Sequence, residues 1–243
     1  MQNEQPFQRL QVELERMIAK KGAGAKLPSE PALAKSLGVS RSTLREAMRT
    51  FEVQGLIRRR QGQGTFVVGK QKTFEGGLEV LESIETLSER IGLNVSMGEF
   101  DIKRFPVSEE NRNLVPFPLK TTLIQIERTI NTEERPIAYL VDILPVTILD
   151  EKDLQNGFDG SVLDWLLKRG DPVLSQSNTR IDSVEASSEI AHKLQIQRGA
   201  ALLFFESDVY DTSNQIVTHS YSYFLPGYFD FHIVRQVAKK YFK

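Results

Sequence analysis

Apolar residues recur at helical spacing in three segments near the N-terminus, and each segment predicts a helix. The first helix is expected over residues 7–20, the second directly after Ser29, and the third from Arg41 to about Gln54. Ser29 can accept a hydrogen bond from the backbone of the second helix and so cap its start. Pro31 fits in that first turn, because the N–H that proline lacks would have no partner there.

A tight turn is expected between the second and third helices. Gly38 can adopt the left-handed conformation that ends a helix, and Ser40 can cap the next one. The third helix has an apolar face of Leu44, Ala47, Met48 and Phe51, and an opposite face of Arg41, Ser42, Arg45 and Arg49. This pattern is typical of a helix-turn-helix, whose second helix places its N-terminal side chains against base edges in the major groove. The alternative is a surface helix with solvated arginines.

Two short strands are predicted after the third helix, at residues 56–60 and 65–68, around a Gly-x-Gly turn. Glycine lets a backbone approach a duplex closely, and the side chains of Gln61 and Gln63 can reach acceptors in the minor groove. We interpret the segment as the wing of a winged helix-turn-helix. The alternative is an ordinary hairpin whose arginines make one edge soluble.

The pattern changes in the second half, where strands alternate with short helices. After a polar linker at residues 70–77, a helix is expected from Leu78 to near Gly92. Strands are predicted at residues 95–105, 121–131, 136–144, 173–182, 200–210 and 216–225, and helices after Ser161 and at residues 186–194. Hairpins interspersed with helices predict an α+β domain with a mainly antiparallel sheet.

Charge separates the same two halves. The formal net charge of the whole chain is −1, but residues 1–70 carry +7 and residues 71–243 carry −8. A small basic segment joined to a larger acidic one favours a polyanion-binding module followed by a domain of another kind. The alternative is chance clustering of solvated charge.

Composition excludes several classes of protein. The chain has no cysteine, so a disulfide framework, a thiolate nucleophile and a Cys-ligated zinc finger are excluded. The three histidines are scattered, and neither a Ser/His/Asp motif nor a Gly-rich phosphate loop is present. We therefore expect no enzyme, metal or cofactor. No membrane-spanning run or secretory signal is visible, so we expect a cytoplasmic protein with no membrane partner.

The N-terminal residues closely resemble the GntR family of bacterial transcription regulators. The resemblance rests on Leu27-Pro28-Ser29-Glu30, Leu37-Gly38-Val39-Ser40-Arg41, Thr43-Leu44-Arg45-Glu46-Ala47 and Gly62-Gln63-Gly64-Thr65-Phe66-Val67. It implies a homodimer that binds a palindromic operator in double-stranded DNA. It also implies DNA contacts by Ser40, Arg41, Ser42, Thr43, Arg45, Gln61 and Gly62, to which the cationic face adds Arg49 and the wing adds Gln63. Pro31 replaces an arginine that commonly helps to bind DNA in the family, so one contact is missing.

The second half resembles the UTRA domain of the HutC subfamily. The resemblance rests on Ile126-Glu127-Arg128, Arg135-Pro136-Ile137-Ala138, Ala191-His192-Lys193-Leu194 and Tyr223-Phe224-Leu225-Pro226. It implies a chorismate-lyase-like fold with a buried pocket for a small-molecule effector. The domains are then residues 1–69 for DNA binding and 78–243 for effector binding and dimerisation. The places that contact ligand in sugar-phosphate-binding members hold Ser83, Arg128, Ser175, Ser177 and Tyr223 here.

Arg128 is the candidate anchor for an anionic effector. It shares a strand face with Ile126 and Ile130, and an arginine on an apolar face is costly unless it is paired. The alternative is an internal ion pair with Glu127, Asp142 or Glu206. Strand serines such as Ser175 and Ser177 are often ordinary, His219 is interpreted as a satisfied strand histidine, and Tyr223 as a core or wall residue.

Two departures from the sugar-phosphate pattern bear on the ligand. Ile130 stands where a second arginine is common, and Leu140 where an acidic residue is common. A smaller or more apolar anion, such as a carboxylate, phosphonate or acyl compound, is therefore as good a candidate as a phosphosugar. The leading hypothesis is a repressor whose operator affinity is controlled by a small anionic effector. An architectural DNA binder with a vestigial second domain is the alternative.

Overall fold

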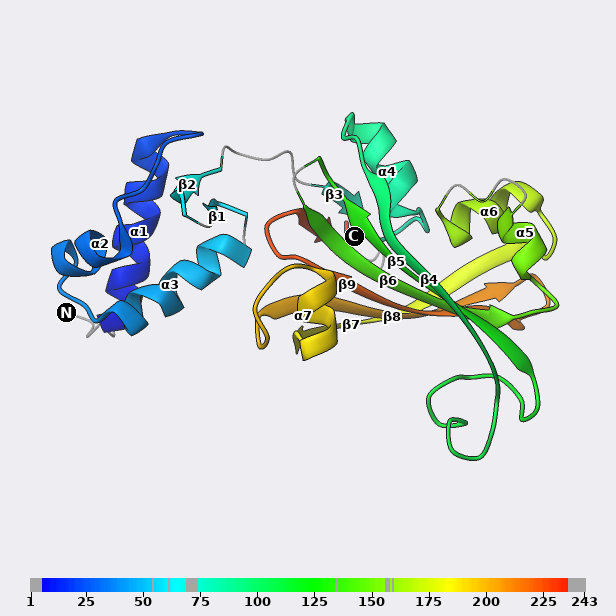
Figure 1. Cartoon of the computed structure of the whole chain (residues 1–243). Coiled ribbons are helices and arrows are strands. Elements are labelled where there is room, and N and C mark those ends of the chain that lie inside the picture. The colour runs from blue at the N-terminus through cyan, green and yellow to red at the C-terminus, as the bar shows by residue number, and fades with distance from the viewer. Residues whose placement is uncertain are drawn as a thin grey trace, which may run out of the picture. The chain divides into compact units, whose positions relative to one another are not determined.

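The computed structural model describes residues 6–53, 55–60, 62–68, 74–133, 135–155, 158 and 160–235. The chain divides into two compact units, each with its own elements (Figure 1). The first unit holds residues 1–73 together with 225–228, and the second holds residues 74–224 and 229–243.

The first unit is a three-helix winged domain. It contains α1 (Pro6–Lys21), α2 (Glu30–Ser36), α3 (Arg41–Val53), β1 (Ile57–Arg60) and β2 (Gly64–Val67). Its core is apolar and is drawn from all three helices and the wing: Leu10, Leu14, Ile18, Leu27, Leu33, Ala34, Leu44, Ala47, Met48, Phe51, Ile57 and Val67. The apolar face predicted for the third helix is therefore confirmed as its packed face.

The turn between α2 and α3 forms as its residue types predict. Gly38 has a φ of +65°, a left-handed conformation that a side chain would strain. The Oγ of Ser40 accepts a hydrogen bond from the backbone N of Thr43 at 3.1 Å and so caps α3. In the wing, β1 pairs antiparallel with β2, and the Leu27 N donates to Thr65 O at 2.8 Å. The segment before α2 therefore joins the hairpin through a single antiparallel bridge, between Lys26 and Phe66.

The second unit is built on a six-stranded antiparallel sheet, with the strand order β4-β5-β6-β9-β8-β7 (Figure 1). The strands are β4 (Ser96–Pro106), β5 (Thr122–Asn131), β6 (Pro136–Pro145), β7 (Leu174–Glu185), β8 (Ala201–Asp211) and β9 (Ile216–Phe224). The helices are α4 (Ile84–Ile91), α5 (Glu151–Gln155), α6 (Val162–Arg169) and α7 (Ser188–Lys193). The predicted α+β class and antiparallel sheet are confirmed.

Two expectations for the start of this unit are wrong. Residues 74–77 are not linker but a strand, β3 (Phe74–Gly77), which pairs in parallel with β10 (Phe229–His232). The rest of the expected linker, residues 70–73, lies outside the described residues. The next helix begins at Ile84 rather than at Leu78, because the Oγ of Ser83 accepts a hydrogen bond from the Thr86 N at 2.9 Å and caps it there.

One face of the sheet packs on α6 to form a hydrophobic cluster. Seven buried side chains form this cluster: Ile124, Ile126, Leu144, Leu149, Val162, Leu166 and Val217. The ring of Trp165 packs against this cluster, and the guanidinium of Arg169 lies 5.1 Å from its centroid. The opposite face is contacted by α7, which packs on β6. Within the described residues, no helix is both long enough and apolar enough to cross a membrane.

Candidate functional site

The N-terminal end of α3 presents a polar surface to solvent. Arg41, Ser42, Arg45 and Arg49 are exposed, and Thr43 is half-buried. The hydroxyl of Ser40 lies 2.7 Å from that of Ser42 and 2.8 Å from that of Thr43. The structure therefore places Arg41, Ser42, Thr43 and Arg45 in the first turns of α3 and Arg49 about one turn further along it. Small hydroxyls and guanidinium groups there can meet phosphates and base edges.

Glu30 holds this surface to the wing. Its Oε2 lies 2.7 Å from Nε of Arg45, and its Oε1 lies 3.3 Å from Nη1 of Arg59 on β1. Arg59 also approaches Glu52 at 3.6 Å. Arg45 nevertheless keeps 57% of its side chain exposed. One carboxylate from α2 thus links α3 and β1, a role that local sequence patterns did not indicate.

The tip of the wing is exposed. Gly62 and Gln63 are open to solvent, and Gly62 has a φ of +72° with no atom within 4 Å of the position that a Cβ would occupy. Gln61, the other wing residue of the expected set, lies outside the described residues. The guanidinium of Arg60 lies 5.2 Å from the ring centroid of Phe66, which holds one cation of the wing against the hairpin.

The second unit contains a cavity of about 560 Å³, within the ordinary size range of small-molecule sites. Its floor is one face of β5, β6, β9, β8 and β7, and residues 78–85 and the start of α6 cover it. Hydroxyl side chains dominate the polar lining: Ser83, Ser161, Ser175, Ser177, Thr179, Ser207, Thr218, Ser220 and Ser222. Apolar walls come from residues such as Leu140, Phe205, Val209, Phe224 and Phe231. The cavity can hold a molecule with both hydroxyl-binding and apolar parts.

Four of the five expected effector residues line this cavity, namely Ser83, Arg128, Ser175 and Ser177. Ser83 donates to Oδ2 of Asp164 at 2.5 Å, so it joins α4 to α6 while capping α4. Ser175 donates to the backbone oxygens of residues 210 and 211, at 3.1 and 2.7 Å. The Ser177 hydroxyl lies 3.2 Å from that of Thr179. Their roles toward a ligand stay predictions.

The expectation that Tyr223 lines the cavity is wrong. Side chains alternate along a strand, and on β9 the cavity takes Thr218, Ser220, Ser222 and Phe224. Tyr223 belongs to the opposite face. There its ring stacks on Tyr139 at 5.9 Å and contacts Phe204 at 5.0 Å, between ring centroids. It is a packing residue of that face, the other role that the sequence allowed.

Arg128 is already paired inside the protein. Its side chain is 4% exposed, its Nη1 hydrogen-bonds to Oδ2 of Asp142, and its Nε lies 3.7 Å from Oε1 of Glu85. Burial opposes the charged form, but the two carboxylates raise the pKa of Arg128 above its ordinary value. The internal ion pair with Asp142 is therefore present. Glu127 and Glu206, the other expected partners, pair with Lys103 and Arg180 instead.

This pairing changes the expectation for the ligand. The hypothesis of an anionic effector rested on Arg128, whose charge is balanced by Asp142 and approached by Glu85. Asp142 also accepts a hydrogen bond from the hydroxyl of Ser220 at 2.7 Å. Glu85 differs, because both of its carboxylate oxygens are buried and accept no hydrogen bond. Burial raises the pKa of Glu85, and the nearby Arg128 opposes this shift.

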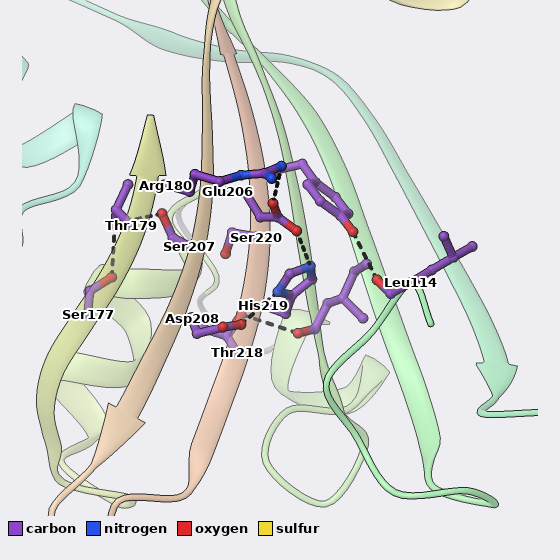
Figure 2. A network of polar contacts seen from close by, with 12 residues as sticks. Leu114, Ser177, Thr179, Arg180, Glu206, Ser207, Asp208, Thr218, His219 and Ser220 are labelled. Atoms are coloured by element: carbon purple, nitrogen blue, oxygen red, sulfur yellow. Dashed lines mark hydrogen bonds and ion pairs between the residues drawn. The ribbon is translucent and has the colours of Figure 1, made fainter. Parts of the chain in front are cut away.

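The face that carries Tyr223 holds a second polar network around His219, which Figure 2 draws together with hydroxyls of the cavity face. Nδ1 of His219 lies 2.7 Å from Oδ1 of Asp208, and its Nε2 lies 3.9 Å from Glu206, which pairs with Arg180 at 2.6 Å. The Tyr221 hydroxyl donates to the backbone O of Leu114 at 2.9 Å. His219 is therefore a strand histidine that does not line the cavity, as its interpretation favoured. It is satisfied at Nδ1 alone, because its buried Nε2 makes no hydrogen bond.

Comparison with known proteins matches each of the two units to a protein family. The UTRA domain family matches residues 91–230, and the bacterial regulatory proteins of the gntR family match residues 7–67. The HTH-type transcriptional repressor NagR of Bacillus subtilis (strain 168) is 25% identical over 196 residues, which cover 81% of this chain and 79% of that protein. The HTH-type transcriptional regulator Mce2R of Mycobacterium tuberculosis is 34% identical over 119 residues, covering 48% of this chain and 49% of that protein.

A solved structure shows the same fold. The crystal structure of PhnF from Mycobacterium smegmatis aligns with a TM-score of 0.62 at 19% identity, over 94% of this chain and 100% of that one. The helix-turn-helix, the wing and the large antiparallel sheet all belong to this shared architecture. Since the UTRA match covers more than half of the chain, this protein belongs to the HutC-type, UTRA-containing regulators of the gntR family of bacterial transcription regulators.

Proposed function

We propose that this protein is a homodimeric repressor that binds a palindromic operator, and that a small molecule in its cavity controls its affinity for DNA. The observation that carries the proposal is the exposed start of α3, where Arg41, Ser42 and Arg45 project from a capped helix that follows a tight turn. The target is bacterial DNA, so we place the protein in the cytoplasm.

We assign operator recognition to the residues at the start of α3 and at the tip of the wing. Arginine can donate two parallel hydrogen bonds to guanine O6 and N7, which makes Arg45 the candidate for base readout. The hydroxyls of Ser40, Ser42 and Thr43 are close enough to one another to bind a phosphate or a base edge together. Gly62 and Gln63 at the wing tip are the candidates for contacts in the adjacent minor groove.

Two copies are needed because one head reads only a half-site. Two-fold operators mirror the symmetry of the protein that binds them, with half-sites about one helical turn apart or a multiple of it. The core of the first unit uses its apolar faces internally, so we assign dimerisation to the second unit. Repression as the mode of action is supported by the relative NagR, an HTH-type transcriptional repressor.

Selection from a random duplex library by the full chain tests operator recognition. We expect an enriched motif with two-fold symmetry, and the same selection with Ser42→Ala and Arg45→Ala together should lose it. Enriched sequences without symmetry would contradict the dimer. Control by a small molecule is tested separately, by measuring operator affinity with and without a compound that binds the cavity. An architectural protein would bind the operator with the same affinity in the presence and absence of the compound.

A further inference from the structure

The cavity of the second unit is lined by more negative than positive charge. Glu79, Glu82, Glu85 and Asp142 contribute carboxylates, whereas Arg128 contributes the one cation among its lining residues in the described part of the chain. Unlike charges inside a low-dielectric site interact strongly, and like charges are costly there. A bound anion would therefore add a further negative charge to a site whose cation is already engaged.

Three of these carboxylates have donors within the protein. Glu82 accepts a hydrogen bond from Nη2 of Arg90 at 2.8 Å, and Glu79 accepts one from the backbone N of Val234. Asp142 accepts from both Arg128 and Ser220. Their hydrogen-bonding capacity is at least partly used, so none of them leaves a buried charge without a donor.

Glu85 is the exception. Both of its carboxylate oxygens are out of contact with solvent and accept no hydrogen bond, although the residue lines the cavity. The nearest cation is Nε of Arg128, at 3.7 Å, and that nitrogen is itself buried without an acceptor. A buried carboxylate without donors is costly, and a ligand that supplies donors removes this cost on binding.

We propose that the effector carries a positively charged ammonium group, which Glu85 binds inside the cavity. This inference rests on the proposed function, because it names the ligand class of the same effector site. An ammonium group supplies three N–H donors and one positive charge, which matches two carboxylate oxygens without donors. Arg128 then positions Glu85 from the other side and holds Asp142 in place.

The remaining lining fits a hydroxyl-bearing or apolar body on this ammonium. Thr179 and Ser207 lie 2.9 Å apart across β7 and β8, and Ser177 extends the row at 3.2 Å from Thr179 (Figure 2). Hydroxyls both donate and accept, so this row can bind alcohols or amides of a ligand. Phe205 and Phe224 supply apolar wall on the same side of the sheet.

Two matched probe series test the charge of the ligand against the full chain by isothermal titration calorimetry. The polyol series is glucamine, sorbitol and gluconate, and the aryl series is phenylpropylamine, phenylpropanol and phenylpropanoate. Within a series only the charge of the head group changes. We expect the ammonium member of at least one series to bind about tenfold or more tightly than its neutral and carboxylate counterparts.

The variant Glu85→Gln should remove this preference, so that the ammonium and neutral probes bind equally. Glu89→Gln is the matched control, because it removes one carboxylate from the exposed side of the same helix and lies outside the cavity. Tighter binding of a carboxylate probe would overturn the proposal while leaving an effector cavity in place. Binding by none of the six probes would also overturn the proposal. Operator recognition is measured separately with DNA, so neither result would bear on the proposed DNA-binding function.

Discussion

The Nε atom of Arg45 lies 2.7 Å from Oε2 of Glu30, so the arginine assigned to base readout is held by a carboxylate of the preceding helix. Glu30 also pairs with Arg59 in the wing. An exposed ion pair of this kind contributes little to stability but fixes where a long side chain points. We infer that Glu30 pre-organises Arg45 and keeps it from binding phosphates indiscriminately.

Arg45→Ala should weaken operator binding by roughly 1–3 kcal/mol, because one bidentate base contact is lost. Preference at one base position should relax at the same time. Fluorescence anisotropy with the operator and with a random duplex of equal length measures both effects. Arg16→Ala, on the exposed side of α1, controls for the loss of one positive charge. An equal loss on both duplexes would identify Arg45 as a phosphate contact.

Glu30→Gln should raise the affinity for random DNA and lower the ratio of operator to random affinity. The substitution removes a negative charge beside the DNA-contacting surface and releases Arg45 and Arg59 from their shared partner. Titrations of both duplexes at several salt concentrations measure the ratio, since non-specific binding depends steeply on salt. An unchanged ratio would show that Arg45 finds its base without help from Glu30.

Arg128→Ala should destabilise the second unit by about 3–5 kcal/mol, because it leaves Asp142 and Glu85 as uncompensated buried charges. The double variant Arg128→Met with Asp142→Leu should recover part of this loss, since neither buried charge of the close pair remains. Differential scanning calorimetry of the full chain compares the variants. A stable Arg128→Ala protein that has lost its response to effector would instead identify Arg128 as a ligand anchor.

The stability of the second unit should depend on the ionisation of Glu85. Burial raises the pKa of Glu85 in the folded chain, so its contribution to stability is present below the unfolded value of about 4.5 and is lost as pH rises through the folded pKa. Glu85→Gln should therefore gain stability relative to the wild type between about pH 4.5 and pH 7. Urea denaturation at the two pH values measures the change, and a difference that stays constant with pH would contradict it.

The full chain should sediment as a dimer at micromolar concentration, and so should residues 74–243. The shorter chain starts at Phe74 because β3 pairs with β10 and belongs to this unit. Analytical ultracentrifugation of both proteins decides the question. A monomeric 74–243 with a dimeric full chain would move the dimer contact to the first unit.

Sequence patterns were most informative where structure is determined locally. The turn at Gly38, the cap at Ser40 and the apolar stripe of α3 depend on neighbours a few residues away, and all formed as predicted. The pairing of β3 with β10 joins residues 74–77 to 229–232, and no local pattern carries that information. Gly76 and Gly77 are typical of a linker, because glycine disfavours strands unless a distant partner is present.

The cavity shows the same limit at the level of single side chains. Strand alternation correctly separates Ser220 and Ser222 from Tyr221 and Tyr223, but it does not say which set faces the cavity. The register between strands decides which set faces the cavity. Ser220 stands opposite Asp142 on β6 and opposite Ser207 on β8, and both of these residues line the cavity. Likewise Arg128 was recognised as a residue in need of a partner, whereas the choice of Asp142 depends on the register between β5 and β6.

The chain has a single tryptophan, Trp165, which lies in α6 and packs against the core of the second unit. That helix begins at Val162, and its N-cap Ser161 and first-turn residue Leu163 line the cavity. Intrinsic fluorescence excited at the indole band therefore originates from the effector-binding unit and from no residue of the DNA-binding unit. A titration monitored by this emission therefore follows ligand binding in the second unit without any label. The anisotropy of a labelled duplex follows DNA binding by the first unit.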